Sequence, residues 1–485
     1  MTREAQTKRV NFLYGAGLCL FALAVLVSLI ALFSRIVWPY PFETGEGISV
    51  YAAQHLEAGK DLYLSPERGA LPIWMYPPLH TALLSLITSD ANPFLPGRIV
   101  SFVSLMAIAF FVAMLVARLG GSWKVSVGAA ACFLVLPESV GFGAAVRVDI
   151  LAAALSLGCI TAGLFSGASI RGLALAAALG CAAWMTKQTA VAAPLAIGVW
   201  LLAYNRKNAL AFAGIYGFLM AACIGCMELA TGRIFLESIV KNAVRPFSWA
   251  LLYDYIRLYP LSFFPLHLIP IFGFVGMLLV LKKTAKKDSL VQIFGLCCLV
   301  NLVWLGKEGS CPLYFFEFNA ACAVGFGLAL IKIESLKGEY AAATAFLIVS
   351  LIGAAGIGHL ADKAFIDLSA KTEKLFVKVL KIHRGPLMME DLGFAIVAGR
   401  ADAVDIPHPD LLKTLVAQGR LSPDRYVQRI QNQTYALIVL SSPAHSMEGL
   451  TRERYPGTIV DAVRDHYAFS GSLGERFFYK PPKEP

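Results

Sequence analysis

The chain has 485 residues, of which 57% are hydrophobic and only 15% are charged, and its formal net charge is +10. Soluble proteins usually carry about 25% charged residues, so this composition excludes an ordinary soluble enzyme. It also excludes an intrinsically disordered chain, which needs low hydrophobicity. In a membrane protein, Lys and Arg mostly record topology and contact with anionic lipids, so the positive charge does not indicate nucleic-acid binding.

The apolar segments predict a polytopic membrane protein. A helix needs about 20 apolar residues to cross about 30 Å of hydrocarbon. The first candidate span is too long for a signal-peptide core and lacks a small-x-small cleavage site, so we expect a retained anchor. We predict an all-α bundle of about 11 transmembrane helices within residues 1–359. The candidate spans are 12–34, 98–117, 125–142, 149–167, 170–185, 188–204, 209–229, 258–281, 289–305, 316–332 and 340–358.

Basic residues predict which side of the membrane each connection faces. If the N-terminus is cytoplasmic, every second connection is also cytoplasmic, and each of these holds at least one Lys or Arg, including the lysine-rich run 282–287. Positively charged loops stay in the cytoplasm. An odd number of spans then places residues 360–485 on the outer, extracytoplasmic face.

The outer loop 38–97, between the first two spans, has a pattern of its own. Residues 46–58 have the pattern of a short amphipathic helix that ends at Gly59, and Pro77-Pro78 precedes a second helix over 79–88. Short amphipathic helices beside a bundle tend to lie in the interface plane. We therefore expect juxtamembrane helices in this loop.

After residue 360, charged residues become frequent and helix and strand patterns alternate. This alternation predicts a small soluble α/β domain over 360–485. All ten cysteines precede residue 323, so this domain is not a disulfide scaffold. Cys223 and Cys226 lie in an apolar run and are expected to pack between helices. The expected helices are 361–380, 409–418, 423–432 and 456–467, and the expected strands are 386–389, 435–440 and 476–480.

Several basic residues lie on the predicted outer side, against the positive-inside pattern. A charge at the membrane boundary is costly unless it is paired or functional. Each one alone fits snorkelling or a local ion pair, such as Arg147 with Asp149 or Lys307 with Glu308. Together they favour a shared anionic ligand, because Arg and Lys bind phosphate through charge-assisted hydrogen bonds. The four residues are Arg98, Arg147, Lys187 and Lys307.

Acidic residues follow the first span directly, within Glu-Thr-Gly-Glu-Gly at 43–47. A carboxylate at this water boundary can deprotonate a hydroxyl, and the glycines let a ligand approach closely. The alternatives are that Glu46 favours the start of the following helix through the helix dipole and that Glu43 is a solvated loop acid. Asp149, in the first turn of an apolar helix, suits a helix start and equally a second site acid.

The order of these pieces resembles the GT-C class of membrane glycosyltransferases, which use polyprenyl-phosphate sugars. The class includes protein O-mannosyltransferases and the bacterial aminoarabinose transferase. The resemblance covers roughly residues 10–330 in architecture and is sharpest over 41–98, and the tail resembles the outer domain appended to some bacterial members. The matching pieces are 41–47, 53–63, 76–79, 97–98, 147–152 and 186–189.

The resemblance implies an inverting transfer of a sugar from a polyprenyl phosphate to an acceptor hydroxyl, outside a bacterial inner membrane. It implies Glu43 as the base, where the class usually has Asp, with Glu46 as a close competitor and Asp149 as a second acid. No cofactor and no metal-ligand set is expected, and assistance by a divalent metal is left open. The acceptor would be a glycolipid, a polysaccharide or a protein. The donor phosphate would be bound by Arg98, Arg147, Lys187 and Lys307. Tyr63 and Tyr76 would contact the substrates.

Other classes of membrane protein remain as alternatives. A transporter usually shows internal repeats and charges at the midplane, whereas here no repeat is visible and the charges cluster at one boundary. A scaffold that displays residues 360–485 would leave the pattern of 43–76 unexplained. A polyprenyl-lipid-dependent glycan polymerase or ligase would share the donor and much of the topology.

Overall fold

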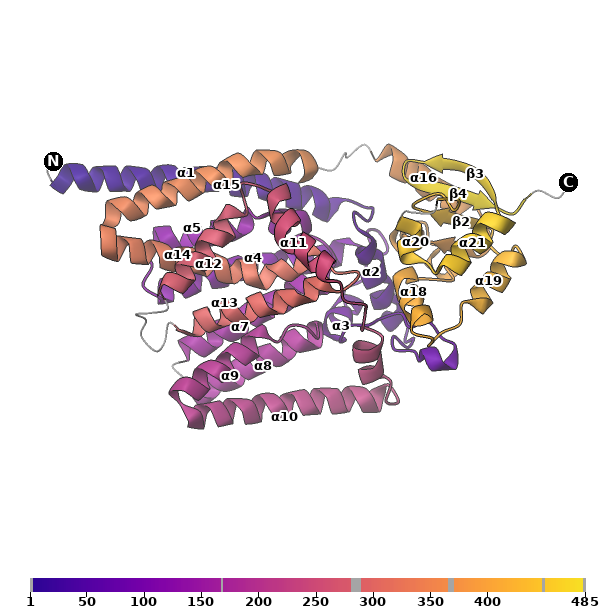
Figure 1. Cartoon of the computed structure of the whole chain (residues 1–485), viewed down its shortest axis with the longest axis horizontal. Coiled ribbons are helices and arrows are strands. Elements are labelled where there is room, and N and C mark those ends of the chain that lie inside the picture. The colour runs from indigo at the N-terminus through magenta and orange to yellow at the C-terminus, as the bar shows by residue number, and fades with distance from the viewer. Residues whose placement is uncertain (1–2, 167–168, 281–288, 365–369, 447–449, 483–485) are drawn as a thin grey trace.

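The computed structural model describes residues 3–166, 169–280, 289–364, 370–446 and 450–482. Most of the helices pack side by side along one direction, and a small sheet with its own helices lies at one end (Figure 1). Within these ranges the chain is predominantly helical, as predicted. The predicted lysine-rich run 282–287 lies outside the described residues.

The bundle confirms a polytopic helical membrane architecture. Seven helical stretches are long and apolar enough to cross a membrane, and four shorter apolar helices accompany them; the number of spans stays a prediction. The helices of the bundle are α1 (Arg3–Val37), α4 (Leu95–Arg118), α5 (Trp123–Leu134), α6 (Pro137–Phe142), α7 (Val148–Phe165), α8 (Ile170–Thr186), α9 (Ala192–Tyr204), α10 (Arg206–Ala230), α11 (Trp249–Ser262), α12 (Leu268–Val280), α13 (Ser289–Asn301), α14 (Phe315–Lys337) and α15 (Glu339–Ala364).

Two predicted spans are each divided between two helices. The segment 125–142 forms α5 and α6, with Pro137 at the start of α6. Proline lacks an N–H and is tolerated in the first turn of a helix, so it ends one helix and opens the next. The segment 258–281 is shared by α11 and α12.

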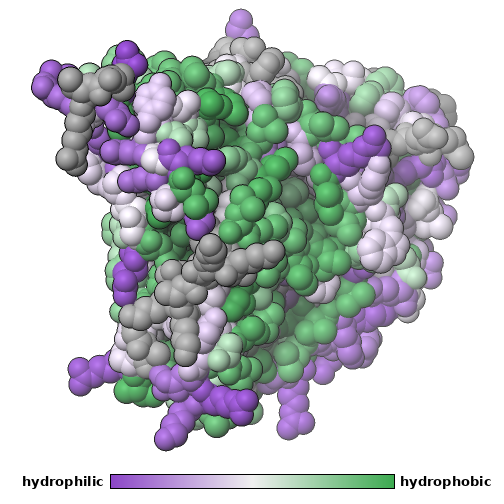
Figure 2. All heavy atoms as spheres, turned by 60° about the vertical axis from the view of Figure 1, so that its left-hand side comes forward, coloured by the Kyte–Doolittle hydropathy of each residue, from purple (hydrophilic) through white to green (hydrophobic). Residues whose placement is uncertain are grey.

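Apolar side chains cover a broad area of the face in Figure 2, with hydrophilic side chains gathered at its margins. Exposed large side chains include Phe12, Phe110 and Leu229, which are 72%, 61% and 81% exposed. Exposed apolar surface of this extent marks contact with another apolar phase, and helices satisfy all their backbone groups inside lipid. The chain is therefore an integral membrane protein.

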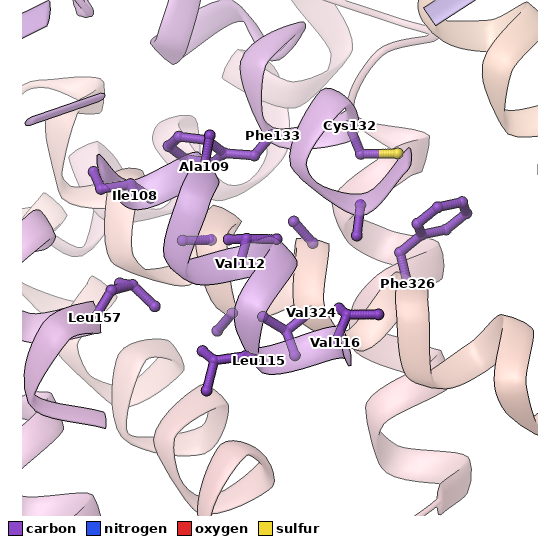
Figure 3. Close-up of a cluster of buried hydrophobic side chains, with 14 of the residues drawn as sticks. Ile108, Ala109, Val112, Leu115, Val116, Cys132, Phe133, Leu157, Val324 and Phe326 are labelled. Carbon is purple, nitrogen blue, oxygen red and sulfur yellow. The ribbon is translucent and has the colours of Figure 1, made fainter. Parts of the chain in front are cut away.

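One face of α4 packs into the interior of the bundle. Its residues Ile108, Val112 and Leu115 are fully buried and face a cluster that includes Phe133 of α5 and Val324 of α14 (Figure 3). Close helix contact in lipid depends on small residues, because packing replaces the hydrophobic effect as the driving force. A Cβ on Gly273 of α12 would lie 2.0 Å from the carbonyl oxygen of Cys322 in α14.

The predicted juxtamembrane helices are present in the outer loop as α2 (Thr44–Glu57) and α3 (Leu79–Ser85). Both lie between the bundle and the tail in Figure 1. Short helical turns complete the outer connections and the tail: η1 (Pro66–Arg68), the π-helical turn η2 (Glu237–Lys241), η4 (Leu302–Gly306), η5 (Pro312–Tyr314) and η6 (Ala401–Ala403).

The tail forms a mixed four-stranded sheet in the order β1-β2-β4-β3. β1 (Leu387–Met389) runs parallel to β2 (Leu437–Leu440), and β4 (Arg476–Lys480) pairs antiparallel with β2 and with β3 (Ala468–Leu473). Leu387 lies opposite Leu437, and Val439 lies opposite Phe478. The helices are α16 (Lys371–Ile382), α17 (Leu392–Val397), α18 (Pro409–Ala417), α19 (Asp424–Gln431), α20 (Leu450–Arg454) and α21 (Gly457–His466).

Three of the four strands match the predicted ones, and β3 was missed. Its residues are largely exposed and include Ser-Gly-Ser, so the segment lacks the alternating apolar pattern of a half-buried strand. Part of the predicted helix 361–380 lies outside the described residues. Its second half corresponds to α16, which begins at Lys371. The domain boundary at residue 360 stays a prediction.

The tail is docked onto the outer loop through two glycines. A Cβ on Gly47 of α2 would lie 2.3 Å from the backbone nitrogen of Gly393 in α17, and a Cβ on Gly393 would lie 2.8 Å from Pro41. The tail also contacts the connection between α10 and α11, where Arg420 pairs with Glu237 of η2 at 2.5 Å. The loop and the tail therefore form one continuous packed unit.

Gly47→Ala should weaken this docking, because the added methyl has no room beside the Gly393 backbone. Overpacking of this kind destabilises by about 1–3 kcal/mol. We expect a lower thermal unfolding temperature of the purified protein and faster amide hydrogen exchange in α17. Gly198→Ala, where a Cβ meets nothing within 4 Å, is the matched control. Equal stability and exchange of the two variants would contradict the docking.

Candidate functional site

A cavity of about 330 Å³ lies where the outer loop, the ends of several bundle helices and the tail meet. Its volume is within the range of small-molecule sites. Its wall is unusually rich in ionisable groups for a protein of this composition. The polar side chains that line it include Glu43, Tyr76, Arg147, Asp149, Lys187, Arg245, Lys307, Glu308, Tyr314, His408, Asp410 and Arg454.

Helix ends bring four of the predicted site residues to this cavity. Glu43 precedes α2 as its N-cap, Arg147 precedes α7 in the same way, and Asp149 lies in the first turn of α7. Lys187 is the C-cap of α8. Since these helices begin or end at one boundary of the bundle, residues that are far apart in sequence share a small volume.

The four side chains form a chain of alternating charge. Arg147 Nη1 lies 3.3 Å from Glu43 Oε1, and Arg147 Nε lies 3.5 Å from Asp149 Oδ2. On its other side, Asp149 Oδ1 lies 2.5 Å from Lys187 Nζ. The Lys187 ammonium also lies 3.6 Å from the centroid of the Tyr314 ring, a cation–π contact.

Gly45 is needed for the contact between Arg147 and Glu43. A Cβ at this position would lie 1.9 Å from Arg147 Nη1 and 2.7 Å from Glu43 Oε1. The glycine noted in the sequence therefore provides room for the guanidinium beside Glu43.

Glu43 has the electrostatic character of a titratable base. Its side chain is only 23% exposed. Burial raises the pKa of its carboxyl above the ordinary value, while the Arg147 guanidinium acts in the opposite direction. A raised pKa makes the carboxylate a stronger proton acceptor.

Lys307 and Arg245 are the cations of the cavity without a carboxylate partner within salt-bridge distance among the described residues. Lys307 and Glu308, which the sequence offered as an ion pair, form no salt bridge in the described part of the chain. Arg245 donates a hydrogen bond to the backbone oxygen of Asp410 at 2.8 Å. Burial, together with the nearby charges of Arg245 and Lys187, lowers the pKa of Lys307 to about 8. Two like charges beside one another favour the approach of an anion.

Glu46 and Arg98 lie outside the cavity lining and pair with each other. Both side chains are fully buried, with Arg98 Nε 2.9 Å from Glu46 Oε1 and Arg98 Nη2 2.8 Å from Glu46 Oε2. Glu46 also accepts hydrogen bonds from the backbone nitrogens of Phe42 and Val146, each at 3.1 Å. The carboxylate thus has no free face for an acceptor hydroxyl.

The Arg98 guanidinium also holds the chain that leads into the outer loop. It donates to the carbonyl oxygens of Arg35, at 2.8 Å, of Trp38, and of Tyr40, at 2.7 Å. With all its donors directed at protein groups, Arg98 is arranged to fix residues 35–46. It has no donor left for a phosphate.

The two tyrosines differ in position. Tyr76 lines the cavity. The buried Tyr63 is one layer behind it, where its hydroxyl donates to the backbone oxygen of Tyr76 at 2.8 Å. Tyr63 therefore supports the wall of the cavity and does not line it.

Sequence reasoning missed several lining residues. Arg245 lies in the predicted outer connection 230–257. Like Lys307, it is a basic residue on the predicted outer side, and this feature could have identified it. His408, Asp410 and Arg454 come from the tail, where nothing in the sequence indicates that they return to the membrane boundary. Burial lowers the pKa of His408 to about 3, so its imidazole is neutral at pH 7.

Two acids of the site, Glu43 and Asp149, face side-chain cations. Within the described ranges, no three or more His, Cys, Asp or Glu side chains are grouped to hold a metal ion. Glu43 and Asp149 are each within 4 Å of an Arg or Lys nitrogen.

No protein-family model and no curated protein matches the sequence. Solved structures do match. ArnT from Cupriavidus metallidurans, bound to undecaprenyl phosphate, is 12% identical with a TM-score of 0.62, and the match covers 95% of this chain and 99% of that one. Its apo structure gives a TM-score of 0.64 at 11% identity, with the same coverage of both chains.

The Archaeoglobus fulgidus oligosaccharyltransferase AglB, in complex with an inhibitory peptide and a dolichol-phosphate, matches at 11% identity with a TM-score of 0.55. This match covers 96% of this chain and 74% of that one. The chain therefore has the GT-C fold of these proteins, as the sequence resemblance predicted.

Arg98→Ala should destabilise the protein strongly, because it leaves the Glu46 carboxylate buried without its partner. Breaking a buried pair in this way costs about 3–5 kcal/mol. We expect a lower unfolding temperature in the absence of any substrate. The double variant Arg98→Met/Glu46→Leu, which removes both charges, should recover much of the loss. A stable Arg98→Ala variant with weakened phosphate binding would instead place Arg98 in a ligand site.

Proposed function

We propose that the chain is an integral-membrane glycosyltransferase that moves a sugar from a polyprenyl phosphate to an acceptor hydroxyl in this cavity. The observation that carries the proposal is that the Glu43 carboxylate shares a cavity with two partly buried cations, Lys307 and Arg245. Among the described residues, neither cation has a carboxylate within salt-bridge distance. Solved structures of the same fold contain undecaprenyl phosphate or dolichol-phosphate, which supports a lipid phosphate as the anion.

Lys307 and Arg245 are proposed to bind the donor phosphate, with Lys187 beside them. Arg147 is committed to Glu43 and Asp149, and Arg98 to Glu46. A cation that is already neutralised attracts an added anion less than one that is not. The phosphate therefore gains most from Lys307 and Arg245, which burial has partly desolvated.

Glu43 is proposed as the general base, in preference to Glu46. In the transfer, the acceptor oxygen forms a bond to the anomeric carbon while the bond from that carbon to the phosphate oxygen breaks, and Glu43 takes the hydroxyl proton. Attack from the side opposite the leaving group inverts the anomeric centre. Arg147 orients the Glu43 carboxylate, and Asp149 holds Arg147 and Lys187 in place.

The leaving group explains why one acid suffices. A polyprenyl phosphate departs as a stable anion, so it needs neighbouring positive charge more than a proton donor. Glycoside hydrolysis differs, because there a second carboxyl protonates a poor leaving group. The proposed orientation places this cavity and the tail on the extracytoplasmic side of a bacterial inner membrane.

Glu43→Gln should abolish sugar transfer while folding and membrane insertion persist. Loss of a general base lowers rates by about 10²–10⁴-fold. The measurement is a transfer assay with purified protein, a panel of polyprenyl-phosphate sugars and candidate glycolipid, polysaccharide and protein acceptors. Glu67→Gln, at an exposed acid of the same loop, is the control. Full activity of Glu43→Gln would remove Glu43 from the role of base, and solute flux without covalent transfer would indicate a transporter.

Donor binding should weaken as the pH rises through about 8, the pKa of Lys307. Below that pH the ammonium is charged and binds the phosphate, whereas above it the charge is lost. Bound phosphate should itself raise this pKa. Lys307→Arg keeps its charge throughout this range, so its donor KM should stay flat from pH 7 to pH 9 while that of the wild type rises. Identical pH profiles for the two proteins would contradict a phosphate contact at Lys307.

A further inference from the structure

Glu317 is an acid of the bundle that the proposed chemistry does not use. It lies in the first turn of α14, a helix whose other residues are largely buried and apolar. An ionisable group inside a membrane bundle is costly unless it has partners or a function. Its surroundings therefore need an explanation.

A second, smaller cavity of about 20 Å³ is also lined by Lys187. Asp149, Lys187 and Tyr314 line both this cavity and the larger one, so the Lys187–Asp149 pair forms the wall between them. Glu317 and Asn301 line only the small cavity. A volume of about 10–15 Å³ is enough for one water molecule when polar groups surround it.

Two buried carboxylate oxygens of residues that line the small cavity, Asp149 Oδ2 and Glu317 Oε1, have no hydrogen-bond partner among the described residues. Arg147 Nε lies 3.5 Å from Asp149 Oδ2, outside hydrogen-bond geometry. The Ser156 hydroxyl lies beside the Glu317 carboxylate. Buried acceptors that remain unpaired carry a penalty of about 1–3 kcal/mol each, and one water has two O–H donors that match the two oxygens.

Asn301, the last residue of α13, connects Glu317 to the segment that carries Lys187. Its amide nitrogen donates to the backbone oxygen of Thr189 at 3.1 Å and lies 3.5 Å from Glu317 Oε2. Thr189 follows Lys187 by two residues. The position of Lys187 thus depends on α13 and α14 as well as on α8.

We propose that Glu317 is a positioning residue for Lys187. Glu317 and Asp149 share one buried water in the small cavity, and Asn301 ties the Lys187–Thr189 segment to the same acid. This inference rests on the proposed function for one point only, that Lys187 faces the donor phosphate.

The arrangement leaves Lys187 with one free donor. An ammonium has three N–H groups; one is directed at Asp149 at 2.5 Å, and the ammonium is also held over the Tyr314 ring. Lys187 lines the larger cavity, so with Asp149 fixed from behind by the shared water the remaining donor is available to a ligand there. If Asp149 could turn, the ammonium would follow it away from the phosphate.

Glu317→Leu should weaken binding of the lipid phosphate without removing the base. We expect the Kd for undecaprenyl phosphate, which carries no sugar, to rise about tenfold, as would follow from a loss of about 1.4 kcal/mol. Donor KM should rise in parallel while kcat stays close to that of the wild type and the acidic limb of its pH profile, set by Glu43, does not move. Glu317→Gln, which can still hold the water, should restore most of the affinity.

The matched control is Glu138→Gln, another buried acid of the bundle that contacts His267 and Asn319 and lines neither cavity. Asn301→Ala keeps the acid but removes the tether, so it decides the question if Glu317→Leu does not fold. An unchanged Kd in either folded variant, or an equal loss in Glu138→Gln, would overturn the positioning role. Normal lipid-phosphate binding without sugar transfer in the wild type would refute the proposed function and leave this test intact.

Discussion

The buried ion pair between Arg98 and Glu46 is the interaction on which the rest of the site depends. Two opposite charges without contact to water are stable only when their hydrogen bonds are complete, and here both partners are saturated by each other and by backbone groups of residues 35–42 and Val146. This fixes the chain between the first span and α2. Glu43 lies inside the fixed segment, so a structural pair determines where the candidate base stands.

Much of the fold could be predicted from the sequence, because hydropathy and basic residues report spans directly. The candidate site could be predicted only in part. The pattern of hydropathy and charge predicted that Glu43, Glu46, Arg98 and Arg147 lie near one membrane boundary. It could not predict which ion pairs form, namely Arg98 with Glu46 and Arg147 with Glu43. That choice depends on a three-dimensional fit, including the space that Gly45 leaves.

The tail is the part for which sequence reasoning was weakest. The sequence pattern predicted most strands and helices of the tail. It contained no indication that His408, Asp410 and Arg454 lie at the cavity. Their position follows from docking at Gly47 and Gly393, where two backbones meet without side chains between them. A chain of the same fold is only 12% identical to this one. Such a similarity establishes the fold, and the function must be argued from the residues of the site.

Binding of a lipid phosphate by Lys307 and Arg245 is best tested by a structure of the protein in lipid with undecaprenyl phosphate bound. We expect phosphate density within hydrogen-bond distance of Lys307 and Arg245, with Glu43 facing the same cavity. We also expect the lipid chain to leave this cavity toward the apolar surface of the bundle. A phosphate bound elsewhere on the protein, with these two cations untouched, would contradict this expectation.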